Sequence, residues 1–141
     1  MQLNGQPVGR FRSAKSLALL AYLALERGSV HSRTHLVTLF WPDLPEENGR
    51  QNLSQTITRL RQTLGPAGDL IMATRQEVWL DKDAEIEIDV QTFRQLLSKT
   101  EQHRHEQKTC CVQCQEDLAR AVALVRGELL AGLTVDDSIE F

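Results

Sequence analysis

Residues 50–64 read RQNLSQTITRLRQTL, and the remainder of the chain is interpreted most simply around this segment. Its apolar side chains recur at i, i+4, i+7 and i+11, namely at Leu53, Ile57, Leu60 and Leu64. This spacing places them on one stripe of an α-helix. Burial of each side chain contributes roughly 1.5–3 kcal/mol, enough to hold the helix against a core. The segment therefore predicts an amphipathic helix with a buried apolar stripe.

The opposite side of this helix is polar and basic. Ordinary solvated helix faces mix Glu with Lys, because opposite charges four residues apart stabilise a helix. Between residues 48 and 68, however, there are three arginines and no acid. The polar side chains that are present can hydrogen-bond base edges and phosphates, so we interpret the helix as one that reads DNA. A surface helix that happens to be basic is the alternative. The polar side carries Gln51, Ser54, Gln55, Thr58, Arg59 and Gln62, with Arg50 and Arg61 beside them.

Length and composition indicate a globular protein. The chain has 141 residues, which is enough for one core or for one domain and part of another. Its hydrophobic content of 41% and charged content of 25% are typical of soluble proteins. No apolar run approaches the ~20 residues that a membrane span needs, and residues 1–11 lack the apolar region of a signal peptide. We therefore expect a cytoplasmic protein with no membrane partner.

The charge is unevenly distributed along the chain. Residues 1–80 hold nine Lys or Arg and six Asp or Glu, a net charge of +3. Residues 81–141 hold seven and thirteen, a net charge of −6. This asymmetry predicts a basic functional domain followed by an acidic domain with a different function.

Two further helices are predicted before the central one. The first spans residues 14–27, which are dense in Leu and Ala, and Ser13 can cap it. The second starts near Ser32 and ends before Pro42, because the residue preceding a proline is disfavoured in the helical conformation. Residues 43–47 are then expected to form a turn that leads into the central helix.

Short β-hairpins are predicted on both sides of these helices. Asn4-Gly5 is a strong two-residue hairpin signal, and strand-like runs at 70–74 and 78–80 flank a second connection. The order hairpin, helix, helix, turn, helix, hairpin is that of a winged helix-turn-helix. In such a domain the third helix enters the major groove and the last hairpin is the wing. We assign residues 1–81 to this domain.

Residues 82–141 predict a second domain, which is helical. One helix begins at Asp89, which looks like an N-cap, and reaches roughly to Gln102. The next helix has an apolar spacing of i, i+3, i+4 and i+7 and ends near Gly127; its apolar residues are Leu118, Ala121, Val122 and Val125. The two helices are expected to form an antiparallel αα-hairpin. The predicted fold class is therefore mainly α with small β-hairpins.

Several segments together carry a resemblance to a known family. They are FRSAKSLALLAYLAL (11–25), LFWPDLPEENGRQNLSQTITRLRQTLG (39–65), IDVQTF (88–93) and ALVRGELLAGL (123–133). These segments resemble the SARP-type bacterial transcriptional activators, in which an OmpR/PhoB-like winged helix is followed by a helical, TPR-like bacterial transcriptional activation domain. The resemblance implies a sequence-specific transcriptional activator whose partner is double-stranded DNA.

Two departures from the family pattern bear on this interpretation. Relatives usually begin with a longer N-terminal sheet, and their helical domain continues with further repeats. Repeat units need neighbours to cover their apolar faces, so we expect residues 82–141 to be a truncated domain of a larger regulator. RNA polymerase or a further regulatory domain of a longer chain is then an expected partner. Formation of a homodimer is an alternative.

The helix-turn-helix interpretation gives the polar residues specific roles. Gln51, Gln55, Thr58 and Arg59, with Ser54 among them, are expected to face the major groove, where Gln suits adenine and Arg suits guanine. Arg50 and Arg61 are expected to neutralise phosphates. By resemblance, Arg75 in the wing lies where relatives touch the minor groove or the DNA backbone.

A second group of residues has the spacing of metal ligands. His103-x-His105 is followed by Cys111-x2-Cys114, and the cysteine pair is spaced like half of a zinc knuckle. Both pairs are expected at the tip of the αα-hairpin, where a structural zinc ion would join the two helices. The alternative is reduced thiols buried as small apolar groups. Cys110 is expected to be dispensable.

Enzyme signatures are absent from the sequence: there is no P-loop, GxSxG, HExxH or dinucleotide fingerprint, and we expect no catalytic residues. His31 and His35 are expected to be capping or surface residues. The competing function is a protein-interaction module that uses the winged helix for dimerisation and the αα-hairpin for docking. A thiol redox or metal sensor would be a regulated version of the DNA-binding protein.

Overall fold

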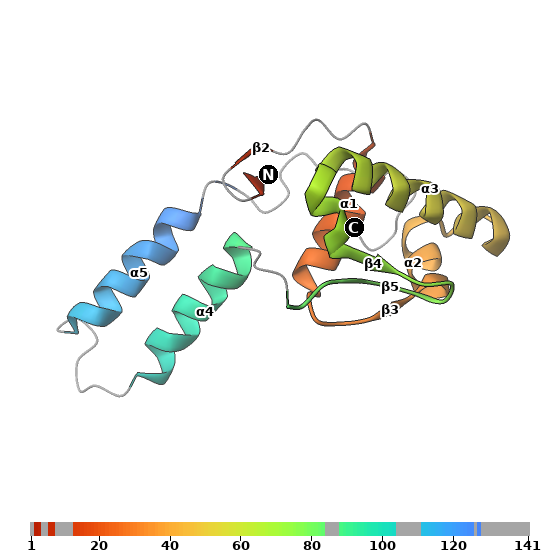
Figure 1. Cartoon of the computed structure of the whole chain (residues 1–141). Coiled ribbons are helices and arrows are strands. Elements are labelled where there is room, and N and C mark those ends of the chain that lie inside the picture. Colours follow the sequence, from red (N-terminus) through yellow and green to blue (C-terminus); the bar gives the residue numbers. More distant parts are fainter. Residues whose placement is uncertain are drawn as a thin grey trace. The chain divides into compact units, whose positions relative to one another are not determined.

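The structure is a computed structural model that describes residues 2–3, 6–7, 13–83, 88–103, 111–125 and 127. The described residues fall into two compact units, one within residues 2–83 and the other within residues 88–127 (Figure 1). Among the described helices, none has the length and apolar character needed to cross a bilayer.

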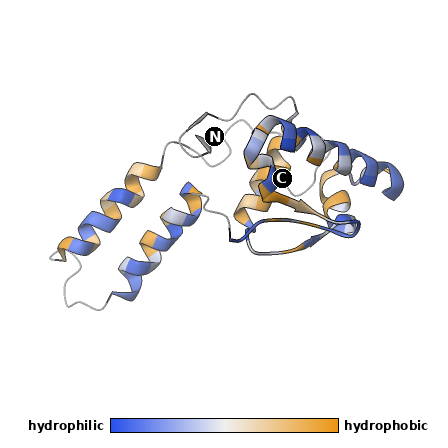
Figure 2. Cartoon of the chain, in the orientation of Figure 1, coloured by the Kyte–Doolittle hydropathy of each residue, from blue (hydrophilic) through white to orange (hydrophobic). Residues whose placement is uncertain are grey.

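The first unit is built on helices α1 (Ala14–Leu25), α2 (Arg33–Phe40) and α3 (Glu46–Leu64). Both α1 and α2 pack against α3. Figure 2 shows that α1 is mainly apolar whereas much of α3 is hydrophilic. The most completely buried large side chains come from all three helices and from the strands, and they are Phe40, Leu19, Leu23, Leu36, Leu53, Leu60, Ile71 and Val78.

The predicted apolar stripe of α3 is confirmed. Leu53 and Leu60 are fully buried and Ile57 is 3% exposed, while Leu64 at the end of the helix is half-buried. Gly49 lies on the same side, where a Cβ atom would come within 2.3 Å of Val37 Cγ1. A glycine at this position therefore permits the close approach of α2 and α3.

The start of α3 differs from the prediction. Residues 43–47 were expected to form a turn, but the helix already begins at Glu46, so the last two residues of that turn are helical. Pro45 occupies the N-cap position, and proline is well tolerated at the start of a helix, where the missing N–H would have no intrahelical partner. Glu46 and Glu47 then place negative charge at the positive end of the helix dipole.

Helices α1 and α2 lie close to their predicted bounds. Ser13 is at the N-cap of α1, as expected, although its side chain makes no capping hydrogen bond. The helix ends at Leu25, two residues before the predicted end, and Gly28 in the following turn has a φ of 95° that favours glycine. Ser32 caps α2, because its hydroxyl accepts a hydrogen bond from the His35 N–H at 3.1 Å.

A three-stranded antiparallel sheet completes this unit. After α3 and a 3₁₀ turn, η1 (Gly65–Leu70), come strands β4 (Ile71–Ala73) and β5 (Glu77–Leu80), which form the predicted wing hairpin. The third strand, β3 (His31–Ser32), pairs with the other side of β5 in the order β3-β5-β4. The sequence analysis missed β3, because two residues are too short to show an alternating pattern.

A separate hairpin lies at the N-terminus. Strands β1 (Gln2–Leu3) and β2 (Gln6–Pro7) pair antiparallel, with Leu3 opposite Gln6. The register agrees with the hairpin predicted at Asn4-Gly5, although those two residues themselves lie outside the described part of the chain.

The second unit is the predicted antiparallel αα-hairpin, formed by α4 (Asp89–Gln102) and α5 (Val112–Leu124). Ile88, rather than Asp89, is the N-cap residue of α4. The buried residues described in this unit are Leu96, Thr100, Cys114, Asp117 and Ala121. The fold class predicted from the sequence is thus confirmed: a winged helix-turn-helix followed by an αα-hairpin.

The apolar stripe predicted for α5 is only partly buried. Ala121 is 1% exposed, but Leu118, Val122 and Val125 are 42%, 69% and 59% exposed. Three of the four side chains are therefore exposed in the described part of the chain. A pair of helices has one shared interface, and in α5 that interface runs through Cys114, Asp117 and Ala121.

Replacing Leu60 by Ala is expected to destabilise the winged helix by ~2–5 kcal/mol, because a fully buried leucine leaves a cavity. Thermal unfolding of the variant measures this loss. Gln62→Ala, on the exposed side of the same helix, is the matched control and should change stability little. An unchanged melting temperature for Leu60→Ala would show that the stripe is not part of the core.

Candidate nucleic-acid interface

The exposed face of α3 carries the polar residues predicted to contact bases. Gln51, Gln55 and Arg59 are all exposed, on the side of the helix away from Leu53 and Ile57. Within the described part of the chain, none of these three side chains has a hydrogen bond or ion pair. Their amide and guanidinium groups can therefore hydrogen-bond a ligand without first breaking a contact within the protein.

The hydroxyl groups on this face are already engaged with the helix backbone. Thr58 Oγ1 donates to the Ser54 carbonyl at 2.9 Å, and Ser54 Oγ donates to the Arg50 carbonyl at 2.9 Å. Ser54 Oγ also accepts a hydrogen bond from Arg33 Nη1 at 2.9 Å. Ser54 thus links α3 to another element, while the Thr58 hydroxyl retains only its capacity to accept.

Arg50 lies at the contact between α2 and α3 and has two partners in the protein. Its Nε donates to Glu46 Oε1 at 2.9 Å, and its Nη2 donates to Thr34 Oγ1 at 3.0 Å. Thr34 Oγ1 in turn donates to Glu46 Oε1 at 3.1 Å. The hydrogen bond from Arg50, followed by that from Thr34, lowers the pKa of the Glu46 carboxyl group. Arg50 is therefore held in place and its charge is partly balanced.

Arg61 joins α3 to the wing. Its Nη2 and Nε donate to the carbonyl oxygen of Ile71, the first residue of β4, at 2.6 and 3.2 Å. This fixes the position of the strand that leads into the wing. The guanidinium group has further N–H donors for a second partner, because arginine carries five.

Arg33 was missed by the sequence analysis, and it connects the exposed face of α3 to the wing. Its Nη1 binds Ser54 on α3, its Nε donates to the Thr74 carbonyl at 2.8 Å, and its backbone N–H donates to the Gln76 carbonyl at 2.7 Å. Burial, and then the positive charges of Arg50 and Arg61, lower the pKa of Arg33. One signal was available: a cation in the first turn of a helix opposes the helix dipole and needs a partner.

Arg75 lies in the turn between β4 and β5, at the tip of the wing, and is exposed. The turn around it is stabilised by Thr74, whose hydroxyl oxygen accepts hydrogen bonds from the N–H groups of Gln76 and Glu77 at 3.2 and 3.0 Å. The backbone on both sides of Arg75 is thereby fixed, while its side chain is presented to the solvent.

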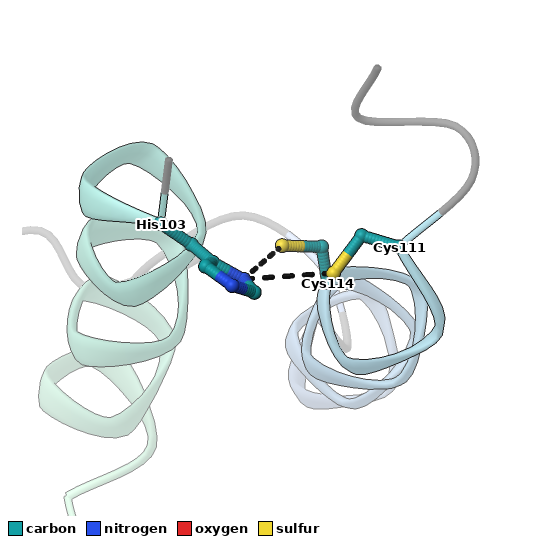
Figure 3. A group of neighbouring side chains, drawn as sticks. All are labelled: His103, Cys111 and Cys114. Carbon is teal, nitrogen blue, oxygen red and sulfur yellow. Dashed lines mark hydrogen bonds between the residues drawn. The ribbon is translucent and has the colours of Figure 1, made fainter. Parts of the chain in front are cut away.

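The predicted metal ligands are partly described. His103 at the end of α4 faces Cys111 and Cys114 at the start of α5 (Figure 3). His103 Nδ1 lies 3.2 Å from Cys114 Sγ and 3.5 Å from Cys111 Sγ, and both cysteines are unbonded to another cysteine. His105 and Cys110 lie outside the described residues.

The two remaining described histidines have different environments. His35 is exposed and shares a 3.0 Å hydrogen bond with the Tyr22 hydroxyl through Nε2. His31 is only 9% exposed and packs against the Tyr22 ring, so its assignment as a surface or capping residue is wrong. Within the described part of the chain, its Nε2 atom has no hydrogen-bond partner. Burial, and then the charge of His35, lower the pKa of His31, and Glu26 acts in the opposite direction.

The lowered pKa of His31 predicts a stability that decreases in mild acid. Above about pH 6.5 the ring is neutral in both folded and unfolded chains. Below that pH the unfolded chain takes up a proton more readily, so stability falls with pH until the folded-state pKa is passed. His31→Phe, which keeps a ring but does not titrate, should lose less stability between pH 7 and pH 5.5 in a thermal-unfolding series. Equal losses of stability in the unaltered protein and in His31→Phe would contradict a lowered pKa of His31.

One family model matches most of the first unit. Residues 11–78 match the family model described as transcriptional regulatory protein, C terminal. No curated protein matches the chain. The matched segment includes α1, α2, α3 and most of the wing sheet, and the family is a DNA-binding regulatory domain rather than an enzyme family. Residues 11–78 thus match the OmpR/PhoB-type winged-helix DNA-binding domain of transcriptional regulatory proteins.

Proposed function

We propose that this protein is a sequence-specific transcriptional activator that places α3 in the DNA major groove and the wing on the flanking backbone or minor groove. The observation that carries this proposal is the exposed face of α3. From Asn48 to its end the helix contains no acid, and Glu46 in its first turn is paired with Arg50. A phosphate backbone can approach the face from Asn48 onwards without like-charge repulsion; the second acid of the first turn, Glu47, is exposed and precedes this part of the helix.

The contacts within the protein divide the basic and polar residues by role. Gln51, Gln55 and Arg59 are proposed to read base edges, because their side chains are exposed and can each form paired hydrogen bonds. Arg75 is proposed to contact the minor groove or the backbone from the wing. Thr58 offers its hydroxyl as an acceptor and its methyl group as an apolar contact.

The remaining arginines are proposed to bind phosphate while holding the interface together. Arg50 and Arg61 each use part of their guanidinium group inside the protein and can offer the rest to DNA. Ser54 is proposed to position Arg33 rather than to read a base. Each phosphate neutralised would steepen the salt dependence of log K by a slope of about 0.9.

The αα-hairpin is proposed to relay regulation. Leu118, Val122 and Val125 form an exposed apolar face on α5, and such a face suits a protein partner. RNA polymerase or a further regulatory domain of a longer chain fits this role. The same face favours a second candidate function, a protein-interaction module that docks through the αα-hairpin and uses the winged helix for dimerisation.

Selection from a pool of random duplex DNA at two salt concentrations distinguishes these functions. The proposed activator should enrich a common sequence and bind it more weakly at the higher salt concentration, because counterion release opposes binding there. Binding that enriches no sequence, or no binding at all by folded protein, would contradict the proposal and favour the interaction module.

The role of Arg59 can be tested on the enriched sequence. Arg59→Ala should lose ~1–3 kcal/mol of binding free energy on that sequence and much less on random DNA, because the contact is to a base. Arg94→Ala removes the same charge from an exposed position on α4 and serves as the control. Equal losses of Arg59→Ala on both DNAs would show that Arg59 contacts only phosphate.

A further inference from the structure

We propose that His103, Cys111 and Cys114 bind a single zinc ion that joins the end of α4 to the start of α5. His103 is the C-cap residue of α4, Cys111 is the N-cap residue of α5, and Cys114 lies in the first turn of α5. Their ligand atoms all lie within 4.8 Å of one another. Two thiols and an imidazole are a ligand set that zinc prefers.

The distances within the cluster are those between neighbouring ligands of a tetrahedral zinc ion. Zn–N bonds of ~2.0–2.1 Å and Zn–S bonds of ~2.3 Å, at a tetrahedral angle, separate nitrogen from sulfur by about 3.5 Å. His103 Nδ1 lies 3.2 Å from one sulfur and 3.5 Å from the other. Only small side-chain shifts would therefore bring the three atoms to bonding distance of one ion.

Hydrogen bonding accounts poorly for this convergence. Each ring nitrogen of histidine forms one hydrogen bond in the plane of the ring, either as donor or as acceptor. Two sulfur atoms, from Cys111 and Cys114, lie near the same Nδ1 atom (Figure 3). One nitrogen cannot make a linear hydrogen bond to both. A metal ion placed among the three atoms could be coordinated by all of them.

Binding of zinc would require both cysteines in the thiolate form. The Cys111 side chain, at the N-cap position of α5, makes no capping hydrogen bond. Cys114 is 3% exposed, so its charge, once formed, needs a close counter-charge.

A metal would compensate for the small core of the helical unit. Among its described residues, only Leu96, Thr100, Cys114, Asp117 and Ala121 are buried. Small domains with so little buried apolar surface are commonly stabilised by a disulfide or a metal. The proposed ion would lie between the end of α4 and the start of α5 and would hold these two helix ends together.

The fourth ligand is assigned from sequence. His105 follows His103 by two residues and is the predicted donor, although it lies outside the described part of the chain. Cys110 is adjacent to Cys111 and is the natural control, because its thiol lies outside the Cys111-x2-Cys114 spacing.

Metal content and cobalt spectroscopy of the full chain test the proposal. Protein purified without chelator should contain about one zinc per chain. After removal of zinc, titration with Co²⁺ should give the intense visible bands of a tetrahedral site with thiolate ligands. Cys111→Ser, Cys114→Ser and His103→Ala should lose or weaken these bands, whereas Cys110→Ser should retain both metal and spectrum.

Hydrogen exchange on the unaltered chain keeps the test valid if a variant does not fold. Removing zinc with a chelator should increase exchange in α4 and α5 and leave α1 to α3 unchanged, because the two units are separate. Metal-free protein with reduced thiols and a fully protected αα-hairpin would overturn the proposal, as would a Cys111–Cys114 disulfide in freshly purified protein. An unchanged cobalt spectrum for His105→Ala would overturn the assignment of the fourth ligand.

Discussion

Burial of one apolar stripe on α3 determines which side chains the winged helix presents. Leu53, Ile57 and Leu60 are buried against α1 and α2, and Gly49 lets α2 approach closely. Successive residues of an α-helix are turned by about 100°, so a rotation by one residue would expose leucine and bury polar side chains. The core therefore fixes the outward direction of Gln51, Gln55 and Arg59 without any contact to those residues. The proposed recognition surface is in this sense a consequence of hydrophobic packing.

The arginines of this unit show how a basic surface is held in shape. Arg33 links α3 to both ends of the wing turn, and Arg61 attaches β4 to α3 through the Ile71 carbonyl. Hydrogen bonds from charged groups are stronger than neutral ones, and the positive charge remains available to a nearby phosphate. Helix and wing are thus positioned together before any ligand binds, which reduces the ordering that binding has to impose.

The sequence predicted what depends on local pattern. The order of helices, the stripe on α3 and the wing hairpin follow from periodicity and turn residues, and the structure contains them. The sequence could not predict contacts between residues distant in the chain. Examples are the pairing of β3 with β5, the hydrogen bond from Arg33 to Ser54 and the burial of His31. In α5 the 3.6-residue period shows which side chains share a face but not whether another element covers it: Ala121 is buried, whereas Leu118 and Val122 are exposed. The Cys/His spacing predicted a cluster, and three of its residues do meet, whereas the identity of the ion depends on chemistry that spacing does not specify.

The central claim is that packing of α3 presents its polar face to DNA. Amide chemical-shift changes of the full chain on titration with a short duplex test it residue by residue. The largest changes are expected at Gln51, Gln55 and Arg59 and at Arg75 in the wing, with α4 and α5 nearly unaffected. Changes concentrated in residues 88–125, with the exposed face of α3 unperturbed by bound DNA, would contradict the account.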